Sequence, residues 1–129
     1  MIHFENFPKC VLIVDDDEYS QEILRKAFSG WGVTDILLAG NGLKAVHVLD
    51  TMLPHPDVLI CDIYMPYMDG IEFIEELVKR NFKGGIIFVS GVNREMLDVA
   101  QTIASHRGLR VLAEFVKPIQ LDALLKVLR

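Results

Sequence analysis

Short apolar runs and amphipathic segments alternate along the whole chain. Five runs rich in Val, Ile and Leu lack a strict alternation of apolar and polar positions, which is typical of strands that are covered on both faces. These predicted strands are CVLIV (10–14), DILLA (35–39), DVLIC (57–61), GIIFV (85–89) and RVLAEFV (110–116).

The segments that follow the strands have the spacing of helices with one apolar face. The first of them places Ile23, Leu24, Ala27 and Phe28 on one side, and the last carries a stripe of leucines that begins at Leu121. The predicted helices are 18–29, 42–50, 71–80, 93–106 and 120–129.

This order of elements predicts a parallel sheet with right-handed crossovers. A chain of 129 residues is long enough for one normal core, so we expect a single domain over residues 1–129. The predicted fold class is α/β, a flavodoxin-like (βα)5 doubly wound parallel sheet with strand order 2-1-3-4-5. In such sheets ligands bind beyond the carboxyl ends of the strands, where the order reverses, which is here between the first and third strands.

Composition narrows the class of protein without naming a function. The apolar runs are far shorter than a membrane span, and no signal peptide is visible, so we expect a soluble, cytoplasmic chain without a membrane partner. The net charge of −5 argues against direct binding of nucleic acid. Cys10 and Cys61 lie in apolar runs, which predicts two buried, reduced thiols.

Polar side chains follow four of the predicted strands. Asp15-Asp16-Asp17 follows the first strand, Asp62 the third, Ser90 the fourth and Lys117 the fifth. Carboxylates about 4 Å apart repel by roughly 4 kcal/mol at an effective dielectric constant of 20, so such a cluster needs cations. Lys117 supplies one, and Mg²⁺, which is held by carboxylates and water, would supply more. A free carboxylate beside such cations can attack a phosphoryl group.

Four pieces of the chain resemble, in order and spacing, the motifs of one family. VLIVDDD, DIYMPYMDG, VSG and FVKPI resemble the acidic, phosphoacceptor, hydroxyl and lysine sites of the receiver domain of two-component response regulators. The resemblance implies that Asp62 is phosphorylated, that Ser90 and Lys117 contact the phosphoryl group, and that the Lys117-Pro118 peptide is cis. It also implies that Mg²⁺ is held by Asp15, Asp16, Asp62 and the backbone carbonyl of Tyr64.

The same resemblance implies the partners. A histidine kinase or a phosphotransfer protein would donate the phosphoryl group. Phosphorylation would then change a face formed by helix 93–106, strand 110–116 and helix 120–129, which binds an output domain or a protein partner. The chain itself would be a signalling domain rather than an enzyme.

The remaining acidic residues near these motifs have simpler interpretations. Asp17 and Glu18 fit the first turn of a helix, where negative charge suits the macrodipole. Asp69-Gly70 fits a turn that starts a helix.

The chain departs from the family pattern at two places. Glu114 stands where many receiver domains have the Tyr or Phe whose rotation reports phosphorylation, and Phe115 faces the opposite side of a strand. Tyr64 and Val92 flank the expected path of the hydrolytic water and neither can act as a base, so we predict slow self-dephosphorylation.

Three alternatives stay open at this point. Gly40–Ala45 matches a dinucleotide-binding pattern, with Asp62 at a suitable distance, but it follows the second strand rather than the first. An aspartyl-phosphate hydrolase of the haloacid dehalogenase type would use Asp15 as nucleophile, with Asp17, Ser90 and Lys117, yet only Asp122 is available for its further acidic pair. The third alternative is a receiver fold that serves as a binding module without phosphorylation.

Overall fold

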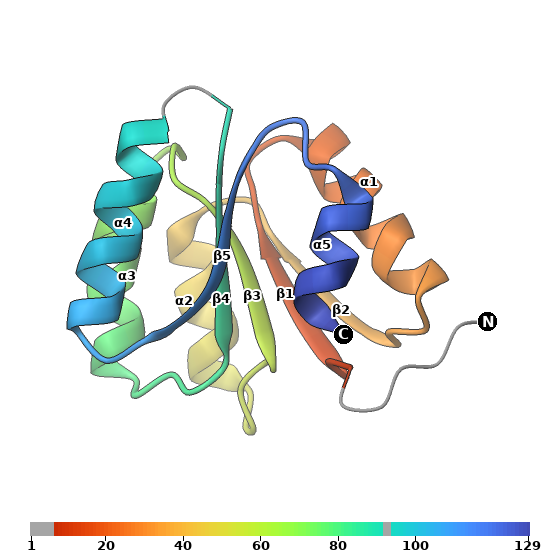
Figure 1. Ribbon diagram of the computed structural model, residues 1–129. Coiled ribbons are helices and arrows are strands. Elements are labelled where there is room, and N and C mark those ends of the chain that lie inside the picture. The colour runs from red at the N-terminus through yellow and green to blue at the C-terminus, as the bar shows by residue number, and fades with distance from the viewer. Residues whose placement is uncertain (1–6, 92–93) are drawn as a thin grey trace.

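The computed structural model describes residues 7–91 and 94–129, which form one α/β domain (Figure 1). Its five strands make a single parallel sheet in the order β2-β1-β3-β4-β5, as predicted. The strands are β1 (Cys10–Val14), β2 (Asp35–Ala39), β3 (Val58–Asp62), β4 (Gly85–Ser90) and β5 (Arg110–Val116). The helices are α1 (Glu18–Gly30), α2 (Gly42–Thr51), α3 (Gly70–Lys79), α4 (Arg94–His106) and α5 (Leu121–Leu128).

The sheet is covered on both faces, which explains why its strands show no amphipathic pattern. In Figure 1, α2, α3 and α4 lie on one face and α1 and α5 lie on the other. Successive β1 residues alternate between the two cores: Leu12 packs on the side of α2–α4, whereas Val11 and Ile13 pack on the side of α1 and α5. Each face therefore buries its own apolar set, and the strands need to be apolar throughout.

The third strand begins one residue later than predicted, at Val58. Asp57 precedes the strand, and its carboxylate accepts hydrogen bonds from the backbone N–H groups of Lys9 and Cys10, at 2.8 and 2.9 Å. The strand extends to Asp62 instead, so this carboxylate lies at the carboxyl end of β3, as expected. Residue 93, where the fourth helix was predicted to begin, lies outside the described residues.

The prediction that both cysteines are buried was wrong for Cys10, and two residues of the predicted apolar helix faces are exposed. Ile23 is 40% exposed and Leu121 is 37% exposed, because both line a shallow hollow of about 320 Å³ between α1 and the start of α5 instead of the core. Cys10 is only half-buried, since it opens the strand at the edge of the core, whereas Cys61 is fully buried as predicted. Burial raises the pKa of the Cys61 thiol, and both cysteines are free.

Within the described ranges, no helix combines the length and the apolar composition that crossing a bilayer requires.

Candidate functional site

The first part of the site is the loop that leaves β1. The backbone N–H of Asp15 donates to the carbonyl of Ala39 at 3.0 Å, which continues the pairing with β2 by one residue. The Asp15 carboxylate is buried, and its Oδ1 accepts the backbone N–H of Asp17 at 2.9 Å. Asp16, the next residue, is exposed. The loop therefore presents one buried and one exposed carboxylate at the end of β1.

The second part is the segment that leaves β3. Asp62 is the last residue of β3 and is only 6% exposed, and its Oδ1 accepts the backbone N–H of Tyr64 at 3.1 Å. The segment returns at Gly70, whose N–H donates to the carbonyl of Ile63 at 2.8 Å. A Cβ at Gly70 would lie 2.9 Å from Ile63 Cα and 3.3 Å from the Asp62 carbonyl oxygen. Position 70 thus requires glycine because α3 starts in direct contact with the backbone beside Asp62.

Lys117 joins the two parts. Its Nζ lies 2.9 Å from Asp15 Oδ2 and 2.9 Å from Asp62 Oδ2. Its backbone N–H donates to the Ser90 carbonyl at 2.9 Å, which fixes the end of β5 against the end of β4. The Lys117-Pro118 peptide is cis, as predicted.

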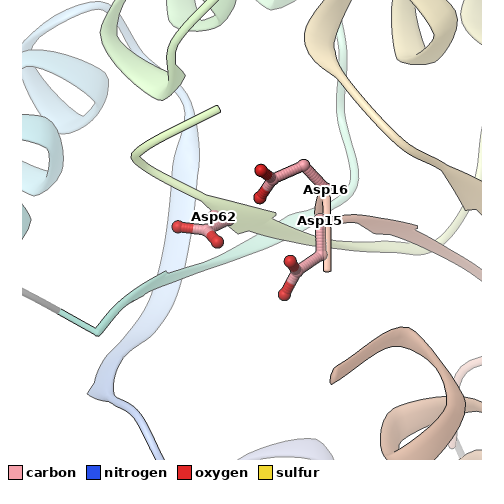
Figure 2. A group of neighbouring side chains, drawn as sticks. All are labelled: Asp15, Asp16 and Asp62. Carbon is pink, nitrogen blue, oxygen red and sulfur yellow. The ribbon is translucent and has the colours of Figure 1, made fainter. Parts of the chain in front are cut away.

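The three carboxylates form a cluster at the reversal of strand order. One carboxylate oxygen from each of Asp15, Asp16 and Asp62 lies within 4.8 Å of the others, and Figure 2 shows their side chains at the ends of β1 and β3. Three negative charges face the single ammonium of Lys117. Carboxylate oxygens at this spacing are the ligands that hard divalent cations prefer, so the donor set fits Mg²⁺.

Burial and the neighbouring charges both shift the pKa values of Asp62 and Lys117. Burial raises the pKa of Asp62, and the nearby Asp15 raises it further, although the hydrogen bond from Lys117 opposes both effects. For Lys117, burial lowers the pKa, but its hydrogen bonds with Asp62 and Asp15 outweigh that effect and the net pKa is raised. A site with one ammonium for two buried carboxylates gains from a further cation.

Asp17 and Asp69, which were predicted to lie at helix starts, cap the N-termini of α1 and α3. Asp17 caps α1 and accepts N–H groups of Tyr19 and Ser20, and the hydrogen bond from the Ser20 hydroxyl lowers the pKa of its carboxyl. Asp69 caps α3 by accepting the N–H of Glu72 at 2.9 Å.

Other predicted residues lie where the topology should bring them. Ser90 is the last residue of β4 and is fully buried. The Tyr64 side chain is 43% exposed, and the roles of its backbone carbonyl and of the Ser90 hydroxyl stay predictions. Val92, the other residue predicted to slow hydrolysis, lies outside the described residues.

The geometry removes support from two alternatives. Gly40–Ala45, the segment that matches a dinucleotide-binding pattern, is a turn that starts α2. Its Asn41 caps this helix by accepting the Lys44 N–H at 2.8 Å. In the hydrolase reading, Asp17 would belong to the catalytic set, but its carboxylate caps α1.

Glu114, in β5, stands at the position where an aromatic residue was expected from the sequence motifs. Phe115 packs with the core on the α1 and α5 side, whereas the Glu114 carboxyl interacts with Asp98 of α4. The two side chains thus face opposite ways, as predicted. Burial raises the pKa of Glu114, and Asp98 adds to this effect while Arg94 opposes it. Its Oε2 is buried without a hydrogen-bond partner among the described residues. No sequence motif pointed to Asp98.

The fold and the site together define a single-domain α/β protein with an acidic, lysine-bridged site at the reversal of strand order. The sequence matches the family model "Response regulator receiver domain" over residues 11–129. It is 33% identical over 95 residues to the "Regulator of RpoS" of Escherichia coli K12, which covers 74% of this chain and 27% of that protein. The chain thus spans about a quarter of the length of this relative.

Solved structures agree with this match. The CheX–CheY–BeF3–Mg complex of Borrelia burgdorferi aligns with a TM-score of 0.79 and 29% identity, over 94% of this chain and 87% of that one. The response regulator TrrA of Thermotoga maritima in complex with Mg²⁺–BeF gives 0.74 and 26%, over 92% and 94%. The chain therefore belongs to the family of response regulator receiver domains. Receiver domains are signalling domains whose standard function is to accept a phosphoryl group, and they bind Mg²⁺ at an acidic pocket.

Proposed function

We propose that this chain accepts a phosphoryl group on Asp62 from a histidine kinase or a phosphotransfer protein of a two-component system. The observation that carries the proposal is the position of Asp62. It ends β3 at the reversal of strand order, is almost fully buried, and shares Lys117 with a second buried carboxylate. Asp69, in the same loop, caps a helix instead.

The chemistry follows from the groups around Asp62. A carboxylate oxygen of Asp62 attacks phosphorus, the new O–P bond forms, and the P–N bond to the donor's histidine breaks, with its electron pair going to the histidine nitrogen. The Lys117 ammonium, 2.9 Å from Asp62 Oδ2, stabilises negative charge on the transferred group. The hydroxyl of Ser90, at the end of the neighbouring strand, donates a hydrogen bond to a phosphoryl oxygen.

Asp15, Asp16, Asp62 and the backbone carbonyl of Tyr64 are the groups that would hold Mg²⁺. When bound, the ion supplies positive charge next to the phosphoryl oxygens. Both oxygens of the Asp15 carboxylate have partners, because Oδ1 accepts the Asp17 N–H and Oδ2 lies beside Lys117 Nζ. These two contacts restrain the orientation of the carboxylate. The relatives crystallised with magnesium support this assignment by similarity.

Phosphorylation would bias an equilibrium between two conformations and change a partner-binding face. We place this face on α4, β5 and α5, where an output domain or a separate protein would bind. Neither a tyrosine at position 64 nor a valine at position 92 can act as a base near neutral pH, so we expect self-dephosphorylation to be slow. We assign the receiver unit to residues 1–129. Phe7 packs edge-on against Trp31 with ring centroids 6.3 Å apart, which supports including the described residues that precede β1.

The test is the intact mass of the protein after incubation with acetyl phosphate, with and without Mg²⁺. We expect one phosphoryl adduct that requires Mg²⁺ and is absent from Asp62→Asn. Asp69→Asn is the matched control, because asparagine also caps helices, and it should be phosphorylated like the wild type. No adduct on folded protein would favour a phosphorylation-independent binding module. An adduct that persists in Asp62→Asn would favour the haloacid dehalogenase-type reading, with Asp15 as nucleophile.

A further inference from the structure

Gln21 is a polar residue of α1 that no motif of the sequence singles out. Its side-chain Nε2 donates to the backbone carbonyl of Asp15 at 2.6 Å, and the contact is partly buried. Its own backbone N–H donates to the Asp17 carbonyl at 3.0 Å in the first turn of the helix. Gln21 therefore connects the rigid, capped start of α1 to the peptide that leaves β1.

This peptide is the one that joins the two neighbouring acidic residues of the site. Because a peptide unit is planar, fixing the direction of the Asp15 carbonyl also fixes the plane in which the Asp16 Cα lies. Asp15 has further restraints, since its N–H is bonded to Ala39 and its carboxylate to Asp17 and Lys117.

Asp16 has no such support from its own side chain. It is exposed, and none of the hydrogen bonds or ion pairs found among residues 7–91 and 94–129 involves its carboxylate. Its oxygen nevertheless lies within 4.8 Å of ligand oxygens of Asp15 and Asp62. The course of the backbone therefore decides where this carboxylate can reach, and the Gln21 amide holds that backbone at the Asp15 carbonyl.

We propose that Gln21 is a positioning residue of the metal site: its amide orients the Asp15–Asp16 peptide so that the Asp16 carboxylate faces Asp62. The inference rests on the proposed function, because it requires that these carboxylates hold Mg²⁺. Gln21 does not touch the metal or the phosphoryl group. Groups that orient ligands in this way typically change metal affinity by 10-fold to 100-fold when they are removed.

The variant that tests the proposal is Gln21→Met. Methionine keeps the length of the side chain and a high helix propensity but has no donor. Gln101→Met is the matched control. Gln101 is also a half-buried helical glutamine, in α4, and its amide donates a hydrogen bond to the Ser105 hydroxyl at 3.3 Å. A second variant, Gln21→Asn, keeps the amide but is shorter by about 1.5 Å, so it should lose the same hydrogen bond.

The primary measurement is a Mg²⁺ titration of each protein, with binding monitored by two-dimensional NMR or calorimetry. We expect the dissociation constant to rise about tenfold in Gln21→Met and Gln21→Asn, and to stay within about twofold of wild type in Gln101→Met. A second readout separates positioning from a general loss of structure. The Mg²⁺ concentration for half-maximal phosphorylation by acetyl phosphate should rise similarly, while the rate at saturating Mg²⁺ stays close to wild type.

Unchanged Mg²⁺ affinity in folded Gln21 variants would overturn the proposal, even if their melting temperature fell, because Gln21 would then only stabilise the loop. A lower rate at saturating Mg²⁺ with unchanged affinity would also overturn it. If the wild type itself binds no Mg²⁺, the proposed function fails and the role of Gln21 fails with it. If the wild type binds Mg²⁺ normally, the result for the variants concerns Gln21 alone.

Discussion

Replacement by alanine should change the free energy of unfolding in opposite directions at Gly70 and at Gly30. The reason is that Gly70 lies against the backbone that leaves β3. In Gly70→Ala, the new Cβ would lie 2.9 Å from Ile63 Cα, whereas carbon atoms attract best at about 3.5–4.0 Å. The obstacle is backbone, so either α3 or the segment after Asp62 has to move by about half an ångström. At Gly30, the last residue of α1, nothing lies within 4 Å of the built Cβ.

The expected size of each effect follows from these contacts. Overpacking costs about 1–3 kcal/mol, and the restriction of the unfolded chain by alanine returns about 0.4–1 kcal/mol. Gly70→Ala should therefore lower the free energy of unfolding by about 1–2 kcal/mol. Gly30→Ala should raise it by about 0.4–1 kcal/mol, because only the second contribution applies.

Urea denaturation of the three proteins measures both effects, with m-values checked for constancy. Gly70→Ala should also be phosphorylated about tenfold more slowly by acetyl phosphate, because small displacements of reacting groups are costly. Gly30→Ala should keep the wild-type rate. The reasoning is refuted if Gly70→Ala is as stable as the wild type, or if both alanines have the same effect on stability.

Three further predictions concern single side chains. Burial and Asp98 raise the pKa of Glu114 above its ordinary value of 4.5, so the folded protein keeps this proton to a higher pH than the unfolded chain and loses stability as pH rises through that window. Urea midpoints measured from about pH 4 to about pH 8 should therefore fall less in Glu114→Gln than in the wild type. If the midpoints of the two proteins change with pH in parallel, the raised pKa of Glu114 is contradicted. Asp17→Ala removes the cap of α1 and should lower the free energy of unfolding by about 1 kcal/mol in urea titrations, whereas an unchanged midpoint would exclude a capping role. In the native protein a thiol reagent should modify half-buried Cys10 but not buried Cys61, with both reacting in denaturant, and equal native rates would mean that β3 opens.

The fold could be predicted because each strand has a recognisable local sequence. Runs such as CVLIV and GIIFV are short, β-branched and bounded by turn residues, and alternation with helices leaves a parallel sheet as the simple solution. The order of strands then determines where the carboxyl ends meet, so Asp15, Asp62 and Lys117 could be placed in one site before their distances were known.

What could not be predicted depends on contacts between elements. A helical apolar stripe does not distinguish residues that face the core from residues that line a surface hollow, so the spacing of Ile23 and Leu121 could not show that both line such a hollow. Nothing near Gln21 or Asp98 in the sequence indicates that one side chain reaches back to the Asp15 carbonyl or that the other meets Glu114. Such pairings arise from the relative placement of helices and loops, which is set by packing rather than by spacing.

The burial of the two carboxylates that Lys117 bridges has a consequence for ionic strength. Their side chains are only 5% and 7% exposed, whereas both partners of the surface pairs Arg25–Glu22 and Arg107–Glu75 are between 41% and 46% exposed. At about 1 M salt the Debye length falls to about 3 Å, and exposed pairs are screened far more than buried ones. Added salt will therefore weaken the attraction between this domain and a charged partner long before it loosens the arrangement of Asp15, Asp62 and Lys117.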